Sequence, residues 1–245
     1  MNQYIKPNER IDDLQIKGLK IIQNPEGFCF GMDAVLLSGF AKVRKDSKVV
    51  DLGCGTGIIS ILIAGKTEAS SITGVELQEP VAEMAQRSIE MNQIGDRVKI
   101  INADLKAAPE ILGLSSMDAV VTNPPYRTKD CGMENPDDVK AISRHEVCCT
   151  LEDVIVASKK LLKPGGKLFM VHRPDRLADI IYLLRQNSLE PKRLQFVHPR
   201  PQAAPNMILV EALRSGGKHL KVEKPLYIYE EGTKYSKEVL NIYGL

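Results

Sequence analysis

The segment at residues 51–57, Asp-Leu-Gly-Cys-Gly-Thr-Gly, contains residue types that could bind a ligand through the main chain. It follows the apolar run 47–52, which indicates a short buried strand, and it leads into residues 57–64, whose apolar spacing indicates a helix. Gly53 and Gly55 can take backbone angles closed to other residues, and without side chains the main chain can approach a ligand closely. The sequence therefore predicts a ligand-binding turn between a strand and a helix.

Three acidic residues end three successive predicted strands. Asp51 ends the first strand, Glu76 ends the run 71–76, and Asp104 follows the run 97–102. Because ligands bind at the carboxyl ends of strands in open α/β sheets, these carboxylates are expected to share one site. Each acid taken singly could equally be a helix cap or a solvated loop residue, whereas the ordered set of three favours a ligand site.

These residues resemble the cofactor site of class I S-adenosylmethionine-dependent methyltransferases. A glycine-rich turn alone also occurs in dinucleotide-binding Rossmann units, so the acids are what favour this family. The resemblance implies that the methionine moiety lies across the turn, that Glu76 accepts from the ribose hydroxyls and that Asp104 accepts from the adenine amino group. The cofactor-binding residues that it predicts in this part of the chain are Asp51, Gly53, Gly55, Gly57, Glu76, Leu77, Asp104 and Leu105.

A second motif, Asn-Pro-Pro-Tyr at residues 123–126, carries groups that could perform the chemistry. It follows the predicted strand 117–122 and so leaves the sheet at the same edge as the glycine-rich turn. Two prolines restrict the chain and fix the direction of the Asn123 side chain and the Pro124 carbonyl. Both oxygens can accept from one NH2 group and favour the pyramidal geometry that its nitrogen reaches in attacking a methyl group. Tyr126 offers a face on which a ring could stack.

This motif resembles that of the amino-methyltransferases, which act on adenine N6, cytosine N4, guanine N2 or a glutamine side-chain nitrogen. The segment 27–37 is similar to the start of a narrower family, the bacterial methyltransferases that modify adenine N6 next to the anticodon of a valine tRNA. In that family the segment covers the cofactor, which implies that Phe30 and Asp33 close the methionine end of the site, with Asn123 beside it. The resemblance covers nearly the whole chain from Phe28 and predicts N6-methylation of an adenine in tRNA.

Three other functions stay open on the sequence. A protein glutamine N5-methyltransferase, acting on a release factor or a ribosomal protein, shares the motif, although that family usually carries a helical domain where only residues 1–45 precede this core. Guanine-N2 rRNA methyltransferases tend to have a duplicated domain and Phe at the position of Tyr126. A non-catalytic RNA-binding scaffold is disfavoured by the intact set of acids together with Asn123.

The composition is ordinary for a globular protein, with 43% hydrophobic and 26% charged residues in 245. The chain has no run of about eighteen apolar residues and no apolar signal-peptide core at its N-terminus, so we expect a cytoplasmic protein without a membrane segment. Five cysteines without a C-x-x-C pair and four histidines without ligand spacing predict no metal site. Cys54 is expected to be a small buried filler rather than a nucleophile.

One segment of the chain is basic, although the net charge is only +2. Residues 191–221 contain the single acid Glu211 and six bases, namely Lys192, Arg193, Arg200, Arg214, Lys218 and Lys221. Such a segment could bind a phosphate backbone or could simply be solvated surface.

The rest of the pattern supplies the elements that position these groups. Besides the strands above, it predicts a hairpin at 13–24, a helix that ends near 41, helices at 79–92, 151–162 and 175–187, a strand at 167–172, and an antiparallel pair at 193–197 and 207–213. The non-periodic segment 127–140 is expected to be a lid or binding loop.

The predicted fold class is α/β, a seven-stranded Rossmann-like class I methyltransferase sheet with helices on both faces and a final antiparallel hairpin. We divide the chain into a hairpin and helix that cover the cofactor site (1–45), the methyltransferase core (46–215), and a strand and helix appendage (216–245). The sequence does not indicate an oligomeric state.

Overall fold

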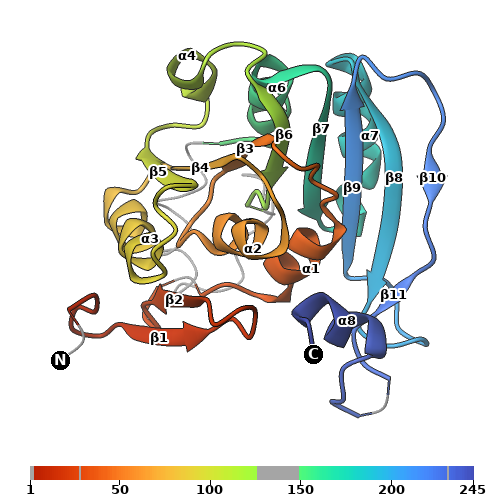
Figure 1. The fold of residues 1–245 in the computed structure, drawn as a ribbon. Coiled ribbons are helices and arrows are strands. Elements are labelled where there is room, and N and C mark those ends of the chain that lie inside the picture. The colour runs from red at the N-terminus through yellow and green to blue at the C-terminus, as the bar shows by residue number, and fades with distance from the viewer. Residues whose placement is uncertain (1–2, 28, 126–148, 231) are drawn as a thin grey trace, which may run out of the picture.

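The computed structural model describes residues 3–27, 29–125, 149–230 and 232–245. In these residues the main sheet is nine-stranded, with the order β10-β8-β9-β7-β6-β3-β4-β5 and with β11 beside β8 (Figure 1). Its strands are β3 (Lys48–Leu52), β4 (Ser71–Glu76), β5 (Val98–Asn102), β6 (Met117–Thr122), β7 (Leu162–His172), β8 (Leu189–His198), β9 (Met207–Arg214), β10 (Lys221–Val222) and β11 (Leu226–Tyr227). Strands β3 to β7 are parallel, and β9 runs antiparallel to both β7 and β8.

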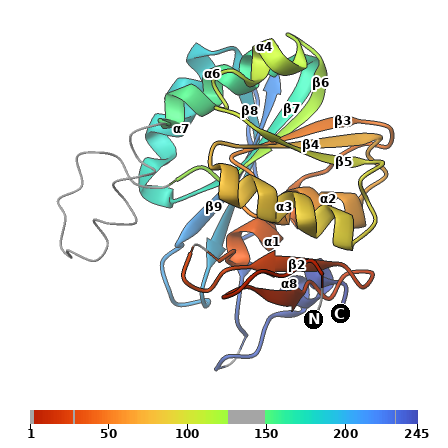
Figure 2. The ribbon, with the colours of Figure 1, turned by 90° about the vertical axis from the view of Figure 1, so that its left-hand side faces the viewer.

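Alternating side chains of the central strands build two cores, one on each face of the sheet. Val49 and Val121 belong to the first core, whereas their neighbours Val50 and Val120 belong to the second. The helices of the first face are α1 (Met32–Phe40), α2 (Ile58–Lys66) and α3 (Glu79–Met91), and those of the second are α4 (Ala108–Leu112), α6 (Leu151–Leu161) and α7 (Leu177–Gln186) (Figure 2). Both faces are therefore covered, as a parallel sheet requires.

A separate hairpin docks on the first face through side chains of α3. It consists of β1 (Arg10–Asp13) and β2 (Lys20–Gln23). The Asn92 amide pairs with the main chain of Lys20 in the manner of a neighbouring strand, accepting from its N–H at 2.8 Å and donating to its carbonyl at 2.6 Å. The C-terminal helix α8 (Lys237–Tyr243) reaches the same core through buried Val239. Residues of all three predicted segments thus pack in one core, and the division into domains stays a prediction.

The predicted α/β sheet, with helices on both faces and a final antiparallel pair, is confirmed, and the structure adds detail at its ends. Strands β10 and β11 extend the sheet beyond β8, and β10 and the five-residue helix α4 were too short to be predicted. Strand β7 begins at Leu162, not at residue 167, because α6 ends at Leu161 and Leu162 pairs at once with Met117 of β6. The predicted helix 175–187 begins as a 3-10 turn, Pro174–Arg176, and continues as α7.

The strand register brings the two sequence motifs to one edge of the sheet. Leu52 pairs with Val75 on one side and with Thr122 on the other. The buried Thr122 hydroxyl also donates to the Leu52 carbonyl at 2.9 Å, which ties the ends of β3 and β6 together. We call this the carboxyl edge. It consists of the residues that follow β3 to β7, namely 53–57, 77–78, 103–107, 123–125 and 173–176, and of residues 199–206 after β8.

Candidate active site

The glycine-rich turn forms as predicted, with main-chain angles that only glycine adopts readily. Gly53 and Gly55 have φ of +70° and +54°. The N–H groups of Gly53 and Cys54 both donate to the Val75 carbonyl, at 2.9 and 3.0 Å, so the turn is anchored on the end of β4. A Cβ atom at either glycine would meet no other atom within 4 Å, which means that open space lies against this main chain.

Asp51 lies in β3 just before the turn and is fully buried, because β3 is a central strand between β4 and β6. Its Oδ2 accepts from the Ser60 N–H at 3.0 Å and from the Ser60 hydroxyl at 2.8 Å. Burial raises the pKa of Asp51 to about 7, and the Glu76 carboxylate adds to the increase. The Oδ1 atom is buried and has no hydrogen-bond partner among the described residues. A buried acceptor of this kind suits a ligand cation, directly or through a water molecule.

Glu76 ends β4 and holds the turn from the other side. Its two oxygens accept from the N–H groups of Gly55, at 3.0 Å, and Gln78, at 2.9 Å. A carboxylate has further lone pairs, so these contacts leave room for ribose hydroxyls. Leu77, the next residue, is 45% exposed, so its side chain is accessible to a ligand beside Glu76.

The third acid lies beyond the next strand. Asp104 accepts from the Lys106 N–H at 2.8 Å and pairs with its ammonium group at 3.3 Å, while Leu105 packs partly into the second core. Asn102, which the sequence analysis missed, donates to the carbonyls of Glu76 and Leu77, at 2.9 Å each. It thereby fixes the distance between β4 and β5 at the carboxyl edge. Only its position at the end of a predicted strand could have indicated this role of Asn102 from the sequence.

The Asn-Pro-Pro motif meets helix α1. The Asn123 side chain is half-buried and donates from Nδ2 to Asp33 Oδ2 at 2.8 Å, and Pro124 is buried. Phe30, just before α1, is half-buried, and its N–H donates to the side-chain oxygen of Gln23 at 3.1 Å. Buried Gln23 thus orients the main chain at Phe30, which precedes α1. The sequence position of Gln23 did not reveal this role. Tyr126 and the segment 127–140 lie outside the described residues.

Two other groups near the edge are held in neutral forms. Cys54 is buried against Gly74, and burial raises the pKa of its thiol well above the usual value, in agreement with its predicted role as a filler. His172, at the end of β7, is buried, and burial lowers its pKa to about 4. Neither group carries a charge near neutral pH.

The basic segment 191–221 is divided between opposite edges of the sheet. Arg200 is exposed at the carboxyl edge, whereas Arg214 and Lys218 lie at or beyond the end of antiparallel β9, at the amino edge. Arg193 forms ion pairs with Glu211 at 2.6 Å and with Glu223 at 3.2 Å. The segment is therefore not one continuous basic surface.

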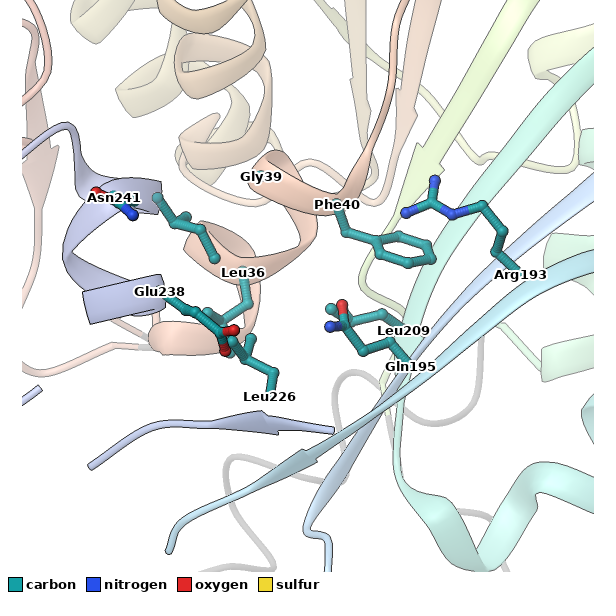
Figure 3. Close-up of a pocket in the computed structure, with 10 residues that line it drawn as sticks. Leu36, Gly39, Phe40, Arg193, Gln195, Leu209, Leu226, Glu238 and Asn241 are labelled. Atoms are coloured by element: carbon teal, nitrogen blue, oxygen red, sulfur yellow. The ribbon is translucent and has the colours of Figure 1, made fainter. Parts of the chain in front are cut away.

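Figure 3 shows how Arg193 is used. It lies over the ring of Phe40, 4.2 Å from the centroid, at a cavity of about 310 Å³ between α1, α8 and β8. Since two carboxylates compensate the guanidinium charge, its role there is to join the sheet to α1.

The carboxyl edge thus combines open space at two glycines, a buried acceptor without a partner among the described residues, two further acids and an exposed leucine. The assignment of these residues to the methionine, ribose and adenine parts of S-adenosylmethionine stays a prediction. Among the described residues, no group of three or more histidine, cysteine or acidic side chains could hold a metal ion. In the same part of the chain, none of the helices has both the length and the hydropathy of a membrane span.

Comparison with known proteins agrees with this arrangement. The family model of the methyltransferase small domain matches residues 31–181, which is more than half of the chain. The chain belongs to the methyltransferase small domain family. The match begins just before α1 and ends in α7, so it includes both sequence motifs.

Individual relatives support the assignment to this family. A protein of Parabacteroides distasonis named tRNA1(Val) (adenine(37)-N6)-methyltransferase is 28% identical over 214 residues, which are 85% of this chain and 89% of the relative. The crystal structure of a predicted O-methyltransferase, Atu636 of Agrobacterium tumefaciens, has a TM-score of 0.70 at 25% identity and covers 87% of this chain and 96% of its own.

A more distant structure shares the fold. It is the geranyl diphosphate C-methyltransferase of Streptomyces coelicolor A3(2) in complex with S-adenosyl-L-homocysteine, with a TM-score of 0.57 at 16% identity over 74% of this chain and 76% of its own. The prediction of an S-adenosylmethionine-dependent methyltransferase is confirmed.

Proposed function

We propose that this methyltransferase transfers the methyl group of S-adenosylmethionine to N6 of an adenine in tRNA, the adenosine next to the anticodon of a valine tRNA. The observation that carries the proposal is the placement of Asn123 and Pro124 at the carboxyl edge, tied by Thr122 to the glycine-rich turn. The name of the Parabacteroides distasonis relative supports the choice of adenine and of tRNA. Because tRNA is found in the cytoplasm, the proposal implies a cytoplasmic enzyme.

The cofactor supplies a methyl group on a sulfonium, whose sulfur takes back the electron pair of the broken carbon–sulfur bond. The chain binds and orients it. The main chain at Gly53 and Gly55 would receive the methionine part, and Asp51 Oδ1, which has no partner in the described part of the chain, would accept from its ammonium group. Glu76 accepts from the ribose, and Leu77 packs on the adenine, whose amino group Asp104 holds. Phe30 and Asp33 cover the methionine end.

Asn123 and Pro124 hold the target amine. Its nitrogen is a poor nucleophile because its lone pair is delocalised into the ring. The two oxygens accept its hydrogens, and this contact strengthens as the nitrogen becomes pyramidal and gains positive charge. The lone pair forms the new carbon–nitrogen bond, and one of the two hydrogens then leaves the positively charged nitrogen as a proton to solvent water. Tyr126 is proposed to stack on the target ring.

The substrate base must leave its stack to enter this site. The free-energy cost of unstacking is lowest in a single-stranded loop such as an anticodon loop. Arg173 follows β7, and Arg200 follows β8, which runs parallel to β7. Both are exposed at the carboxyl edge, and we assign the phosphate contacts to them in place of the whole basic segment.

The test is incubation of the protein with methyl-labelled S-adenosylmethionine and total bacterial tRNA that lacks N6-methyladenine. Digestion to nucleosides should place the label in N6-methyladenosine. A parallel incubation with release factors and ribosomal proteins is the control. Label in a protein glutamine, with none in RNA, would replace this proposal by the glutamine N5-methyltransferase.

A further inference from the structure

The contact between Asp33 and Asn123 joins two segments that are 90 residues apart, with Asn123 Nδ2 at 2.8 Å from Asp33 Oδ2. The other oxygen of Asp33 accepts from the Ala34 N–H at 2.9 Å, which holds the carboxylate at the first turn of α1. An ionised carboxylate can only accept hydrogen bonds, so the atom of Asn123 that faces it must be the amide nitrogen. The amide oxygen of Asn123 is therefore directed away from Asp33.

We infer that Asp33 is a positioning residue, which acts through Asn123 to present the amide oxygen to the target amine. This inference rests on the proposed function and deepens it. Without the carboxylate, the Asn123 amide could rotate by half a turn and place its own NH2 against the substrate NH2, where two donors face each other. Asp33 removes that alternative.

The carboxylate also strengthens the acceptor. A hydrogen bond from an amide to a charged acceptor is stronger than a neutral one, and it polarises the amide so that its oxygen becomes more negative. A more negative oxygen stabilises the positive charge that develops on the attacking nitrogen.

Asp33 and Asn123 are both held by well-packed elements, so the contact between them can fix the direction of the Asn123 amide oxygen. Residues 34–38 of α1, next to Asp33, are all buried in the first core or against it. Asn123 follows Thr122, whose hydroxyl bond to Leu52 fixes the end of β6. The geometry is therefore set before substrate binds.

The first test compares Asp33→Ala with Asp33→Asn. Asp33→Ala should lower kcat about tenfold to a hundredfold, the loss expected for a charge-assisted hydrogen bond. KM for tRNA should stay within about threefold, and Kd for S-adenosylmethionine should rise much less than kcat falls, because Asp33 only covers the methionine end while the glycine-rich turn and Glu76 are unchanged. Asp33→Asn retains an oxygen that can accept from Asn123 and should recover part of kcat. A loss confined to cofactor affinity would overturn the inference and leave Asp33 as a cofactor ligand.

An exchange of the pair separates positioning from a general structural role. Asn123→Asp alone places two carboxylates at hydrogen-bond distance, so they repel or share a proton. The double variant Asp33→Asn with Asn123→Asp restores one donor and one acceptor and leaves a carboxylate oxygen to receive the amine. We expect it to be at least about tenfold more active than Asn123→Asp. Equal activities of the two variants would contradict the positioning role.

An NMR measurement without substrate distinguishes a failure of the positioning role of Asp33 from a failure of the proposed function. In wild-type protein the side-chain amide protons of Asn123 should exchange slowly and shift downfield in NMR spectra, and Asp33→Ala should remove both effects. An unchanged Asn123 amide in Asp33→Ala would overturn the inference even if tRNA is methylated. If wild type labelled no tRNA, the proposed function would fail, while this spectrum would still decide whether Asp33 orients Asn123.

Discussion

At the scale of single residues, we propose that uncharged acceptors serve the transfer, while main chain and carboxylates bind the cofactor. Asn123 and Pro124 offer oxygens, two glycines offer main chain, and buried Asp51 offers one oxygen without a partner among the described residues. Catalysis at such a site depends on where acceptors point rather than on a nucleophile or an acid, because the cofactor supplies the reactive group. Substitutions should therefore separate binding from transfer.

Asn123→Ala should lower kcat by a factor of about 100 or more, because the amide acceptor is lost in the transition state. The Kd of S-adenosylmethionine should stay within about threefold of wild type, since the glycine-rich turn and Glu76 are untouched. Single-turnover kinetics and calorimetric titration measure the two quantities. A matching loss of cofactor affinity would make Asn123 a structural residue instead.

The raised pKa of Asp51, about 7, predicts a pH dependence of cofactor affinity. An ammonium group binds the ionised form better, so Kd should fall about tenfold between pH 5.5 and 7, while the cofactor amine stays protonated. Asp51→Asn should bind weakly and show no such slope. A slope that survives this substitution would assign the titration to another group.

The raised pKa of Asp51 affects folding stability in the opposite direction, so that stability falls as pH rises. Because burial raises the pKa of Asp51 from 3.8 to about 7, the protonated acid stabilises the fold below pH 3.8, and this contribution is lost as pH rises through 7. Asp51→Asn should therefore gain thermal stability relative to wild type at pH 8 more than at pH 5.

At the scale of elements, the turn depends on how closely β4 approaches Cys54. A Cβ atom at Gly74 would lie 2.8 Å from Cys54 Sγ and 2.8 Å from Ile100 Cδ1. Gly74 is thus the position that lets strand and turn pack together. We expect the affinity of the turn for its proposed ligand to depend on this residue.

Gly74→Ala should lower the free energy of unfolding by about 1–3 kcal/mol through overpacking, and should also weaken cofactor binding. Gly95→Ala is the matched control, because its Cβ would have only Ile89 Cγ2 nearby, at 4.0 Å, and we expect a change within about 0.5 kcal/mol. Urea denaturation compares the two variants. Equal stabilities would show that Cys54 and Ile100 move aside at little cost.

The elements also explain what the sequence could and could not predict. Strand-to-helix periodicity and the turn residues are local, so the glycine-rich turn, the order of the acids and the Asn-Pro-Pro motif were predictable. The hydrogen bonds of Asn102 to Glu76 and of Asn123 to Asp33 depend on sheet order and on the packing of α1, which no local pattern encodes. The division of the basic segment was not predictable for the same reason, since β8 and β9 each cross the sheet and the bases at their ends therefore lie at opposite edges.

At the scale of the whole molecule, the sheet separates the carboxyl edge, where we propose that the reaction occurs, from the amino edge. The amino edge has its own basic residues, including Lys192, which donates to the Gly217 carbonyl at 3.0 Å, and Lys218. If RNA approaches the carboxyl edge, only bases on that side should affect its affinity.

Arg173→Ala with Arg200→Ala should weaken tRNA binding and lower the slope of log Kd against log salt by about 1.4–1.8, the value for two lost phosphate contacts. Lys192→Ala with Lys218→Ala removes the same charge at the amino edge and should leave the slope unchanged. Fluorescence anisotropy over a salt series measures both. A larger effect of the amino-edge pair would place the RNA on the opposite side of the sheet.

The most direct test of the account is to map the methyl group on a defined substrate. Unmodified valine tRNA transcripts, one with the adenosine next to the anticodon and one with guanosine there, are incubated with the protein and S-adenosylmethionine and then analysed by mass spectrometry of nuclease fragments. We predict one methyl group on N6 of that adenosine and none on the guanosine transcript. A methyl group at another nucleotide, or on both transcripts alike, would contradict the proposed function.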